Sequence, residues 1–544
     1  MDLKDKLKSA LIIEPQSLTQ NYLKISLRNL GFNHLDIVDR ASIAIKSVAN
    51  RNYSLILCSS ELKSGPDGFQ LFEHLVKAKL VRASSCFVFL SAENSLAQSQ
   101  SVLELKPDDF ILKPFSAKEI EMRLKGILSK KVMLNDVYRE MDKENYDGAN
   151  NLLNKHISKN VAPKYIPYYM KLKGELLLLL NEWSFGKDFF SKVCDITPHS
   201  WAQLGLVKCL IELGELDTAK DKLELMVKNP QIEIKAYDLL AELYQKYNEF
   251  DKAAKHLKIA STLSPRNVDR LQELVTLSRL LHDFETQSSA SNSIVRQLNN
   301  SVHNSPEYYL SAARSNVDYG LTTMNDEEVT KIAQVSQSIL GNLRKNFPEE
   351  SFTEQMEVVQ ARILNLRNEK EKAKKILSKF ISRLDKNLNY ISCIEDGLDQ
   401  AKAFHELGFH TQSQQLFEDL VNYSQLSDSD PILMQYINEE QQLRIEIKES
   451  PKELNNKAVG YFQIGKYRRA LQSFEMAYKL MPRNPSIALN LMQTVIESDS
   501  YFIDDQRLMA LISDCKNTIA NSQLNVGQRE RYDKLNEMLE QRFA

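Results

Sequence analysis

The sequence contains little glycine and little proline. Of its 544 residues, 16 are glycine and 15 are proline, about 3% each, whereas soluble domains average roughly 7% and 5%. Glycine and proline belong to turns and are disfavoured inside helices. A chain of this length with so few of them is expected to be mostly helical.

Cysteine patterns and long apolar runs are also missing. The six cysteines form no C-x-x-C pair and have no histidines at ligand spacing, which disfavours a zinc site and a disulfide framework. The longest apolar runs, such as Leu176 to Leu180, are far below the roughly 18 residues of a membrane span. The first apolar run, Ala10 to Ile13, stops at Glu14-Pro15 and resembles no signal peptide. The protein is expected to be cytoplasmic, with no membrane insertion.

The charges nearly cancel. Seventy Lys and Arg residues face 72 Asp and Glu residues, for a formal charge of −2, so no global field attracts a phosphate backbone. We therefore expect no nucleic-acid partner. The length suggests roughly three to five domains, or one compact domain joined to an extended array.

Residues 10 to 130 alternate between short apolar runs and amphipathic stretches. Runs of this length, rich in β-branched and aromatic residues, predict buried parallel strands with crossover helices. This pattern predicts a doubly wound α/β domain, whose functional residues are expected at the carboxyl ends of the strands. The runs are Ala10 to Ile13, Leu55 to Cys58, Cys86 to Leu90 and Phe110 to Leu112.

The strand ends carry a recognisable order of residues: Glu14, the turn Gly65-Pro66-Asp67-Gly68, Ser91-Ala92 and Lys113-Pro114-Phe115. In this order residues 1–130 resemble the flavodoxin-like (CheY-like) receiver domain of bacterial response regulators. The resemblance implies an aspartate after the third strand that accepts a phosphoryl group, and an acidic pair that holds Mg²⁺. It also implies a Ser or Thr and a Lys on the phosphoryl oxygens, and a cis peptide before Pro114.

The sequence departs from that pattern at the acceptor. Ser59 occupies the acceptor position, and a one-residue shift in the alignment brings Cys58 or Ser60 there. Only Glu14 is left of the acidic pair, because Pro15 follows it. An acyl phosphate needs a carboxylate, and the transfer needs a cation. We therefore expect no Mg²⁺-dependent phosphorylation, no cofactor, no metal and no catalytic residue, so that the protein is not an enzyme.

The other site residues allow two interpretations. Glu14, Ser91 and Lys113 are the remnant of the receiver site, or Lys113 simply pairs with Glu14 across the strand ends. Phe110 occupies the position of the receiver's switch aromatic, or is an ordinary core side chain.

Beyond residue 130 a period of about 34 residues appears. The spacings resemble tetratricopeptide repeats (TPR), in which paired helices stack into a superhelical solenoid whose groove holds a protein or peptide. We predict a TPR-type domain over residues 131–544, divided into two sub-arrays, 131–298 and 350–544. The clearest units are Tyr237, Ala241, Tyr244, Asn248, Phe250, Ala253, Leu257, Ala260 and Pro265, then Ala458, Tyr461, Gly465, Tyr467, Ala470, Phe474, Ala477 and Pro482.

The architecture resembles the receiver-TPR auxiliary regulators of bacterial two-component systems. This implies a non-enzymatic pseudo-receiver that binds a histidine kinase or phosphotransfer partner and inhibits phosphoryl flow in the phosphorelay to an intact response regulator. The partner-binding residues would be Leu18, Tyr22 and Phe115. A homodimer is possible. The alternative is a TPR scaffold or adaptor for the assembly of an envelope, pilus or secretion complex.

Overall fold

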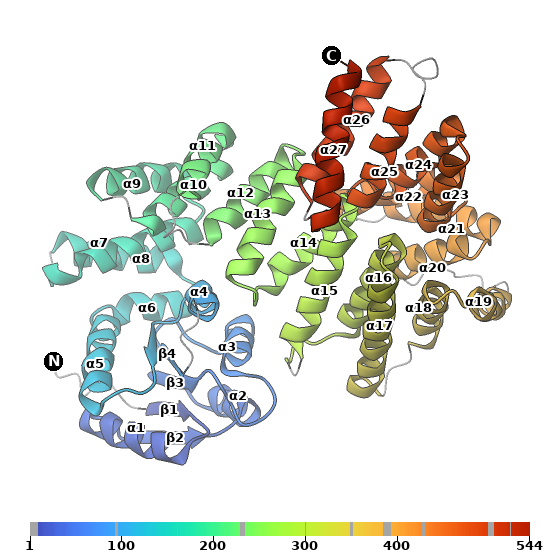
Figure 1. The fold of residues 1–544 in the computed structure, drawn as a ribbon. Helices are drawn as coiled ribbons and strands as arrows, with labels where there is room; N and C mark the ends of the chain where they lie inside the picture. The colour runs from blue at the N-terminus through green and yellow to red at the C-terminus, as the bar shows by residue number, and fades with distance from the viewer. Residues whose placement is uncertain are drawn as a thin grey trace. The chain divides into compact units, whose positions relative to one another are not determined.

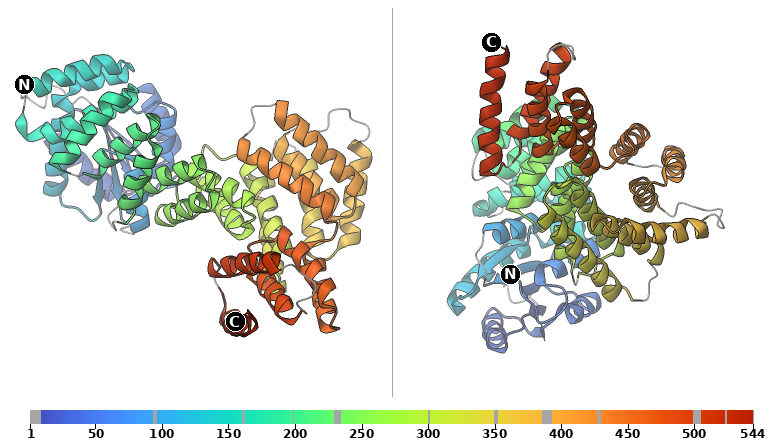
Figure 2. Two further views of the ribbon diagram at one scale, coloured as in Figure 1. Left: turned by 90° about the horizontal axis from the view of Figure 1, so that it is seen from above. Right: turned by 45° about the vertical axis from the view of Figure 1, so that its right-hand side comes forward.

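The structure is a computed structural model that describes residues 9–92, 96–159, 162–197, 199–228, 234–299, 301–348, 352–384, 393–426, 430–498, 505–522 and 524–543. The chain divides into two units (Figures 1 and 2). The first comprises Met1–Leu271 with Arg296–Asn304, and the second Gln272–Val295 with Ser305–Ala544. The predicted domain boundary at residue 130 falls inside the first unit and stays a prediction.

The first unit begins with a five-stranded parallel sheet of order β2-β1-β3-β4-β5. This confirms the predicted doubly wound α/β fold. The prediction from apolar runs did not include β2, which lies at the sheet edge, is partly exposed and has no such run. The elements are β1 (Ser9–Ile13), α1 (Ser17–Asn29), β2 (His34–Val38), α2 (Ala41–Asn50), β3 (Leu55–Ser59), α3 (Gly68–Lys77), β4 (Cys86–Ser91), α4 (Leu96–Leu105), β5 (Asp109–Leu112) and α5 (Ala117–Met133).

Alternate residues of the central strands enter two separate cores. Ala10 and Ile12 pack on one face with α1 and α5, whereas Leu11 and Ile13 pack on the other face with α2 and α3. Side chains alternate across a strand, so a strand covered on both faces must be apolar throughout. This explains why β1, β3 and β4 are continuous apolar runs whose polar residues stand at or next to their ends.

Antiparallel helix pairs make up the rest of the first unit. They are α6 (Asn135–Asp142), α7 (Tyr146–Ser158), the 3-10 turn η2 (Pro163–Tyr165), α8 (Ile166–Leu179), α9 (Trp183–Ile196), α10 (Ser200–Glu212), α11 (Leu216–Met226), α12 (Lys235–Lys246), α13 (Phe250–Leu263) and the start of α14 (Val268–Leu280).

The second unit is helical throughout its described residues. After the end of α14 it contains α15 (Phe284–Leu298, whose last residues belong to the first unit), α16 (Pro306–Thr322), α17 (Asp326–Asn346), α18 (Thr353–Leu366), α19 (Lys370–Leu384), α20 (Ile394–Glu406), α21 (His410–Leu426), α22 (Pro431–Glu446), α23 (Pro451–Gln463), α24 (Tyr467–Leu480), α25 (Pro485–Glu497), α26 (Asp505–Ala520) and α27 (Val526–Phe543).

A left-handed residue recurs between paired helices. In the described residues it stands two positions before the second helix at Glu144, Asn181, Gly214, Asn248, His282, Asn368, Gly408 and Gly465. Glycine and asparagine tolerate positive φ best, which explains why they dominate this position. Gly214, Asn248 and His282 follow one another at 34-residue steps. The helical region is therefore compatible with repeats, and its identity as TPR stays a prediction.

Close helix contacts account for two of the glycines. The Phe190 ring on α9 would lie 2.6 Å from a Cβ atom at Gly174 and 2.4 Å from one at Gly205. Phe190 is almost fully buried. Larger residues at either position would displace the ring, so these glycines set the approach of α8 and α10 to α9.

Within the first unit, buried polar contacts join the α/β part to the helices. Arg270, whose side chain is 1% exposed, donates to Asp238 of α12 at 2.6 Å and also pairs with Glu104 of α4. Arg266 pairs with Asp67 at 2.7 Å. A buried guanidinium requires such partners, so this face of the α/β part is covered by the chain itself. Among the described residues, no helix is both long and apolar enough to cross a membrane.

Candidate functional site

The carboxyl edge of the sheet gathers most of the predicted site residues. Glu14 follows β1, Ser59 ends β3 and Lys113 follows β5. The Lys113 ammonium group lies 2.6 Å from Glu14 Oε2 and 3.2 Å from Ser59 Oγ. Parallel strands bring these three side chains together because their carboxyl ends lie at one edge.

Glu14 is fully buried and held from several sides. Its Oε1 accepts a hydrogen bond from the Gln16 backbone at 3.0 Å, and its backbone carbonyl accepts one from Gln20 Nε2 at 2.6 Å. The Lys113 side chain is 16% exposed. A buried carboxylate needs a paired cation and hydrogen bonds. The structure therefore contains the Glu14–Lys113 pair that was one of the two interpretations from sequence.

The serines at this edge form two separate contacts. Ser59 accepts from Lys113, whereas Ser60 donates to Ser91 at 3.0 Å. All three serines are buried. Cys58 enters the opposite core, and burial raises the pKa of its thiol well above the usual range. Cys58 therefore points into the core, and Ser59 is the residue at this strand end that contacts Lys113.

Close packing fixes the backbone after Ser59. A Cβ atom at Gly68 would lie 2.1 Å from the Ser59 carbonyl oxygen, so only glycine permits this approach. The residues before and after Gly68 form a capping box at the start of α3. The Asp67 side chain accepts a hydrogen bond from the Gln70 backbone N–H, and the Gln70 side chain accepts one from the Asp67 backbone N–H. The Gly65–Gly68 turn that supported the resemblance thus starts α3.

The arrangement does not fit Mg²⁺, the cation of working receivers. Mg²⁺ is bound through carboxylates. Glu14, which shares Lys113 with Ser59, is already paired with that lysine, and Asp67 is paired with Arg266. Within the described residues, no group of three His, Cys, Asp or Glu side chains is placed to hold a metal ion. We therefore derive no chemistry through a cation here.

The aromatic residues near β5 are partly buried. Phe110 packs against the core that contains Leu11 and Ile13, and Phe115 packs against the core that contains Ala10 and Ile12. The Lys113–Pro114 peptide bond is cis, as the resemblance implies. The role of Phe110 as a switch stays a prediction. Phe115 is partly buried, and its role in binding a partner stays a prediction.

Helix α1 exposes an apolar stripe. Leu18 is 84% exposed, Tyr22 43% and Ile25 61%. Steps of four and three residues place them on one helical face. The Tyr22 hydroxyl accepts a hydrogen bond from the Ala117 backbone at 3.2 Å, which ties the stripe to α5. Sequence reasoning named Leu18 and Tyr22 and missed Ile25, although the heptad step from Leu18 could have indicated it.

Comparison with protein families matches residues 10–125 to the "Response regulator receiver domain". Curated relatives match the same part. The chain is 31% identical over 118 residues to "Transcriptional activator protein IrlR" of Burkholderia pseudomallei (22% of this chain, 49% of that protein). It is 26% identical over 130 residues to "Aerobic respiration control protein ArcA" of Escherichia coli (24% and 52%). The chain thus spans about half the length of these relatives.

Solved structures also match about a quarter of this chain. One is a CheY-like receiver domain protein from Methanospirillum hungatei, at 22% identity and a TM-score of 0.22, covering 24% of this chain and 98% of that one. Another is a CheY-like receiver domain from Methylobacillus flagellatus, at 28% identity and a TM-score of 0.20, covering 22% and 99%. Residues 10–125 therefore form a response regulator receiver domain, which a large all-helical region follows.

Proposed function

We propose that the protein is a non-enzymatic regulator of two-component signalling. Its receiver domain binds a histidine kinase or another phosphotransfer protein and inhibits phosphoryl flow to an intact response regulator. The observation that carries the proposal is Ser59 at the end of β3, in contact with Lys113, where phosphorylation would require a carboxylate. The proposed role is that of the VieB-type auxiliary regulators, whose architecture the sequence resembles.

The chemistry of the site supports a binding role. Among the residues that the structure describes, no free base lies beside the Ser59 hydroxyl to activate it. The Lys113 ammonium is a hydrogen-bond donor, and the Glu14 carboxylate is engaged by Lys113. The two charges of this pair are balanced by one another, so the site supports binding rather than phosphoryl transfer.

The α1 stripe supports a docking role. Leu18, Tyr22 and Ile25 are apolar and exposed beside the carboxyl edge of the sheet. Apolar anchors at the centre of an interface commonly contribute about 2 kcal/mol or more each. A phosphotransfer partner that presents an apolar helix can therefore bind here whether or not position 59 is phosphorylated.

We expect no acyl phosphate on this protein. Incubation of the full chain with acetyl phosphate and Mg²⁺ should leave its mass unchanged, because the end of β3 has no carboxylate. An ordinary response regulator receiver in the same reaction serves as the positive control. A phosphorylated species that hydroxylamine removes would contradict the expectation, since serine phosphate esters resist hydroxylamine.

We also expect the protein to slow phosphoryl transfer. A stoichiometric excess over a cognate kinase should reduce the rate at which that kinase phosphorylates its intact regulator. Leu18→Asp with Ile25→Asp should weaken this inhibition at least tenfold, since two anchors are lost. These positions are preferable to Phe115, whose truncation would also disturb the core.

A matched control uses Ile43→Asp, which places the same charge on α2, at a residue 42% exposed on the opposite face of the sheet. This variant should inhibit as the wild type does. If transfer rates are the same with and without the protein, the inhibitory proposal fails. In that case the scaffold or adaptor alternative, in which the helical region assembles other proteins, takes its place.

A further inference from the structure

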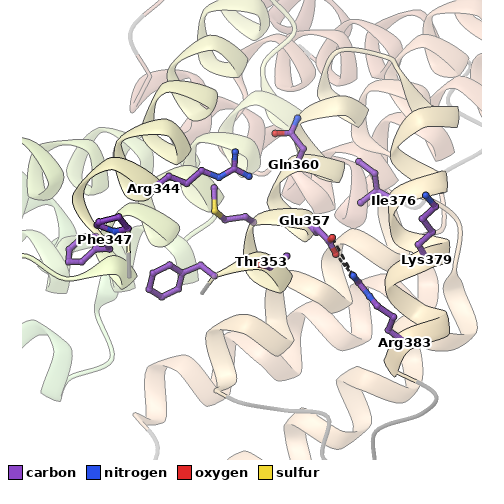
Figure 3. Close-up of a pocket in the computed structure, with 11 residues that line it drawn as sticks. Arg344, Phe347, Thr353, Glu357, Gln360, Ile376, Lys379 and Arg383 are labelled. Atoms are coloured by element: carbon purple, nitrogen blue, oxygen red, sulfur yellow. Dashed lines mark hydrogen bonds and ion pairs between the residues drawn. The ribbon is translucent and has the colours of Figure 1, made fainter. Parts of the chain in front are cut away.

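A groove in the second unit lies between three consecutive helices. It is formed by the end of α17, the first half of α18 and the second half of α19, and has a volume of about 670 Å³. Figure 3 shows its lining side chains converging from these helices. Ligand pockets commonly range from about 300 to 1,000 Å³, so the groove is large enough for several side chains of a bound segment.

The floor of the groove is apolar. Phe347 and Phe352 flank it and are only partly buried against the core of α16 to α18. Met356 is 7% exposed, and Ile376 of α19 is also partly buried. Apolar side chains left partly open inside a concavity favour an apolar group of a ligand, because its burial removes their contact with water.

The walls of the groove are cationic. Arg344 of α17 and Lys379 of α19 are exposed, and neither has an ion-pair or hydrogen-bond partner among the described side chains. Arg383 of α19 is paired with Glu357 of α18, the acid of the described lining. In Figure 3, Gln360 and Glu357 lie between Arg344 on one side and Lys379 with Arg383 on the other. Two cations therefore remain available for acidic groups of a ligand.

We infer that this groove binds an acidic peptide segment with an apolar anchor, presented by a partner protein. The apolar floor takes the anchor, and Arg344 and Lys379 attract acids on either side of it. Gln360 supplies a neutral hydrogen-bonding group for the peptide backbone. Nucleic acid fits less well, because its binding requires many phosphate contacts and the chain has a formal charge of −2.

This inference goes beyond the proposed function, which concerns the receiver domain alone. Charge reversal at the groove should leave the inhibition of phosphoryl transfer unchanged, whereas the α1 variants should leave peptide binding unchanged. The two proposals can therefore fail separately.

The test is selection from a random peptide-display library against the full chain. Peptides enriched on the wild type should combine several Asp or Glu residues with an aromatic or aliphatic residue. Their binding to Arg344→Glu/Lys379→Glu, measured by fluorescence anisotropy with a labelled enriched peptide, should be at least tenfold weaker. Binding to the wild type should also weaken as ionic strength rises.

The matched control is Lys345→Glu/Lys375→Glu. It makes the same charge change on the same two helices, at exposed lysines that do not line the groove. Circular dichroism melting checks that both double variants remain folded. The control variant should bind the enriched peptide within about twofold of the wild type.

Two results would overturn the inference. The first is enrichment of peptides without acids, or no enrichment at all. The second is equal loss of binding in the groove and control variants.

Discussion

Replacing Arg362 with methionine should lower the free energy of unfolding of the second unit by about 3–5 kcal/mol. The Arg362 side chain is 1% exposed, and its nitrogens lie 2.6 Å from carboxylate oxygens of Asp318, Asp399 and Glu406. Asp318 has a second cation in Lys402, at 2.9 Å. Asp399 would keep only its longer contact with Arg314, at 3.4 Å, and Glu406 would lose its contact with Arg362. A buried carboxylate without its cation is strongly destabilising.

Hydrogen exchange of α16, α18 and α20 should detect this loss as reduced protection. Tryptophan fluorescence would not, because the two tryptophans of the chain, Trp183 and Trp201, lie in the first unit. Arg367→Met is the control: the same substitution at an exposed residue that caps the end of α18 should change stability by less than about 0.5 kcal/mol. Equal protection in both variants would show that the ion pairs of Arg362 contribute little to the stability of the second unit.

The second unit should also lose about 2 kcal/mol of stability between pH 6.5 and pH 5 through His405. Burial, with the nearby charge of Arg444, lowers the pKa of His405 from 6.5 to about 3. In this pH range His405 therefore binds a proton in the unfolded chain but stays neutral in the folded chain. The stability that neutral His405 provides is fully present above pH 6.5 and is lost as the pH falls towards 3.

His405→Gln should flatten this dependence, and calorimetric melting of the second unit between pH 7 and pH 5 measures it. Glutamine retains an acceptor for Arg444, whose Nη1 lies 3.2 Å from His405 Nδ1. His282, whose pKa is also lowered by burial, acts in the same direction, so some dependence remains in the variant. His34→Gln, at an exposed histidine of the first unit, is the control. An unchanged slope in His405→Gln would show that His405 is not the group responsible.

At lower pH, carboxylates add to the loss. Although burial alone would raise the pKa of Glu440, the charges of Arg444 and Lys402 lower it to about 2. A folded pKa below the unfolded one means that the stabilisation is present above about pH 4.5 and is lost as the pH falls through 2. Acid unfolding of the second unit is therefore expected to steepen below pH 4.5.

Sequence reasoning located the receiver domain because its signals are local. Apolar runs such as Leu55 to Cys58 indicate strands by themselves, and the residues after them lie at one edge of any parallel sheet. The side-chain contacts at that edge, in contrast, join residues that are far apart in the sequence. Ser60, rather than Ser59, donates to Ser91, and Ile25 completes the apolar face of α1.

The buried charges of the second unit had no sequence signal. Charged residues in a helix usually lie on its solvated surface. Arg362, however, stands between buried Ala361 and Ile363 and is buried with them. A single arginine in a helix is normally predicted to be exposed, because burying an unpaired charge costs much free energy. Its partners lie on α16 and α20, far from it in the sequence.

The sequence by itself determined the α/β and helical parts of this protein and the absence of a carboxylate at Ser59, because strand runs, helical periods and the residue at a strand end are all local properties. Only the tertiary structure decided that Lys113 pairs with Glu14, that Arg362 is buried among carboxylates, and that Arg344 and Lys379 stand across an apolar groove. The physical reason is that the energy of a charged side chain depends on which distant residues the fold brings within a few ångströms of it.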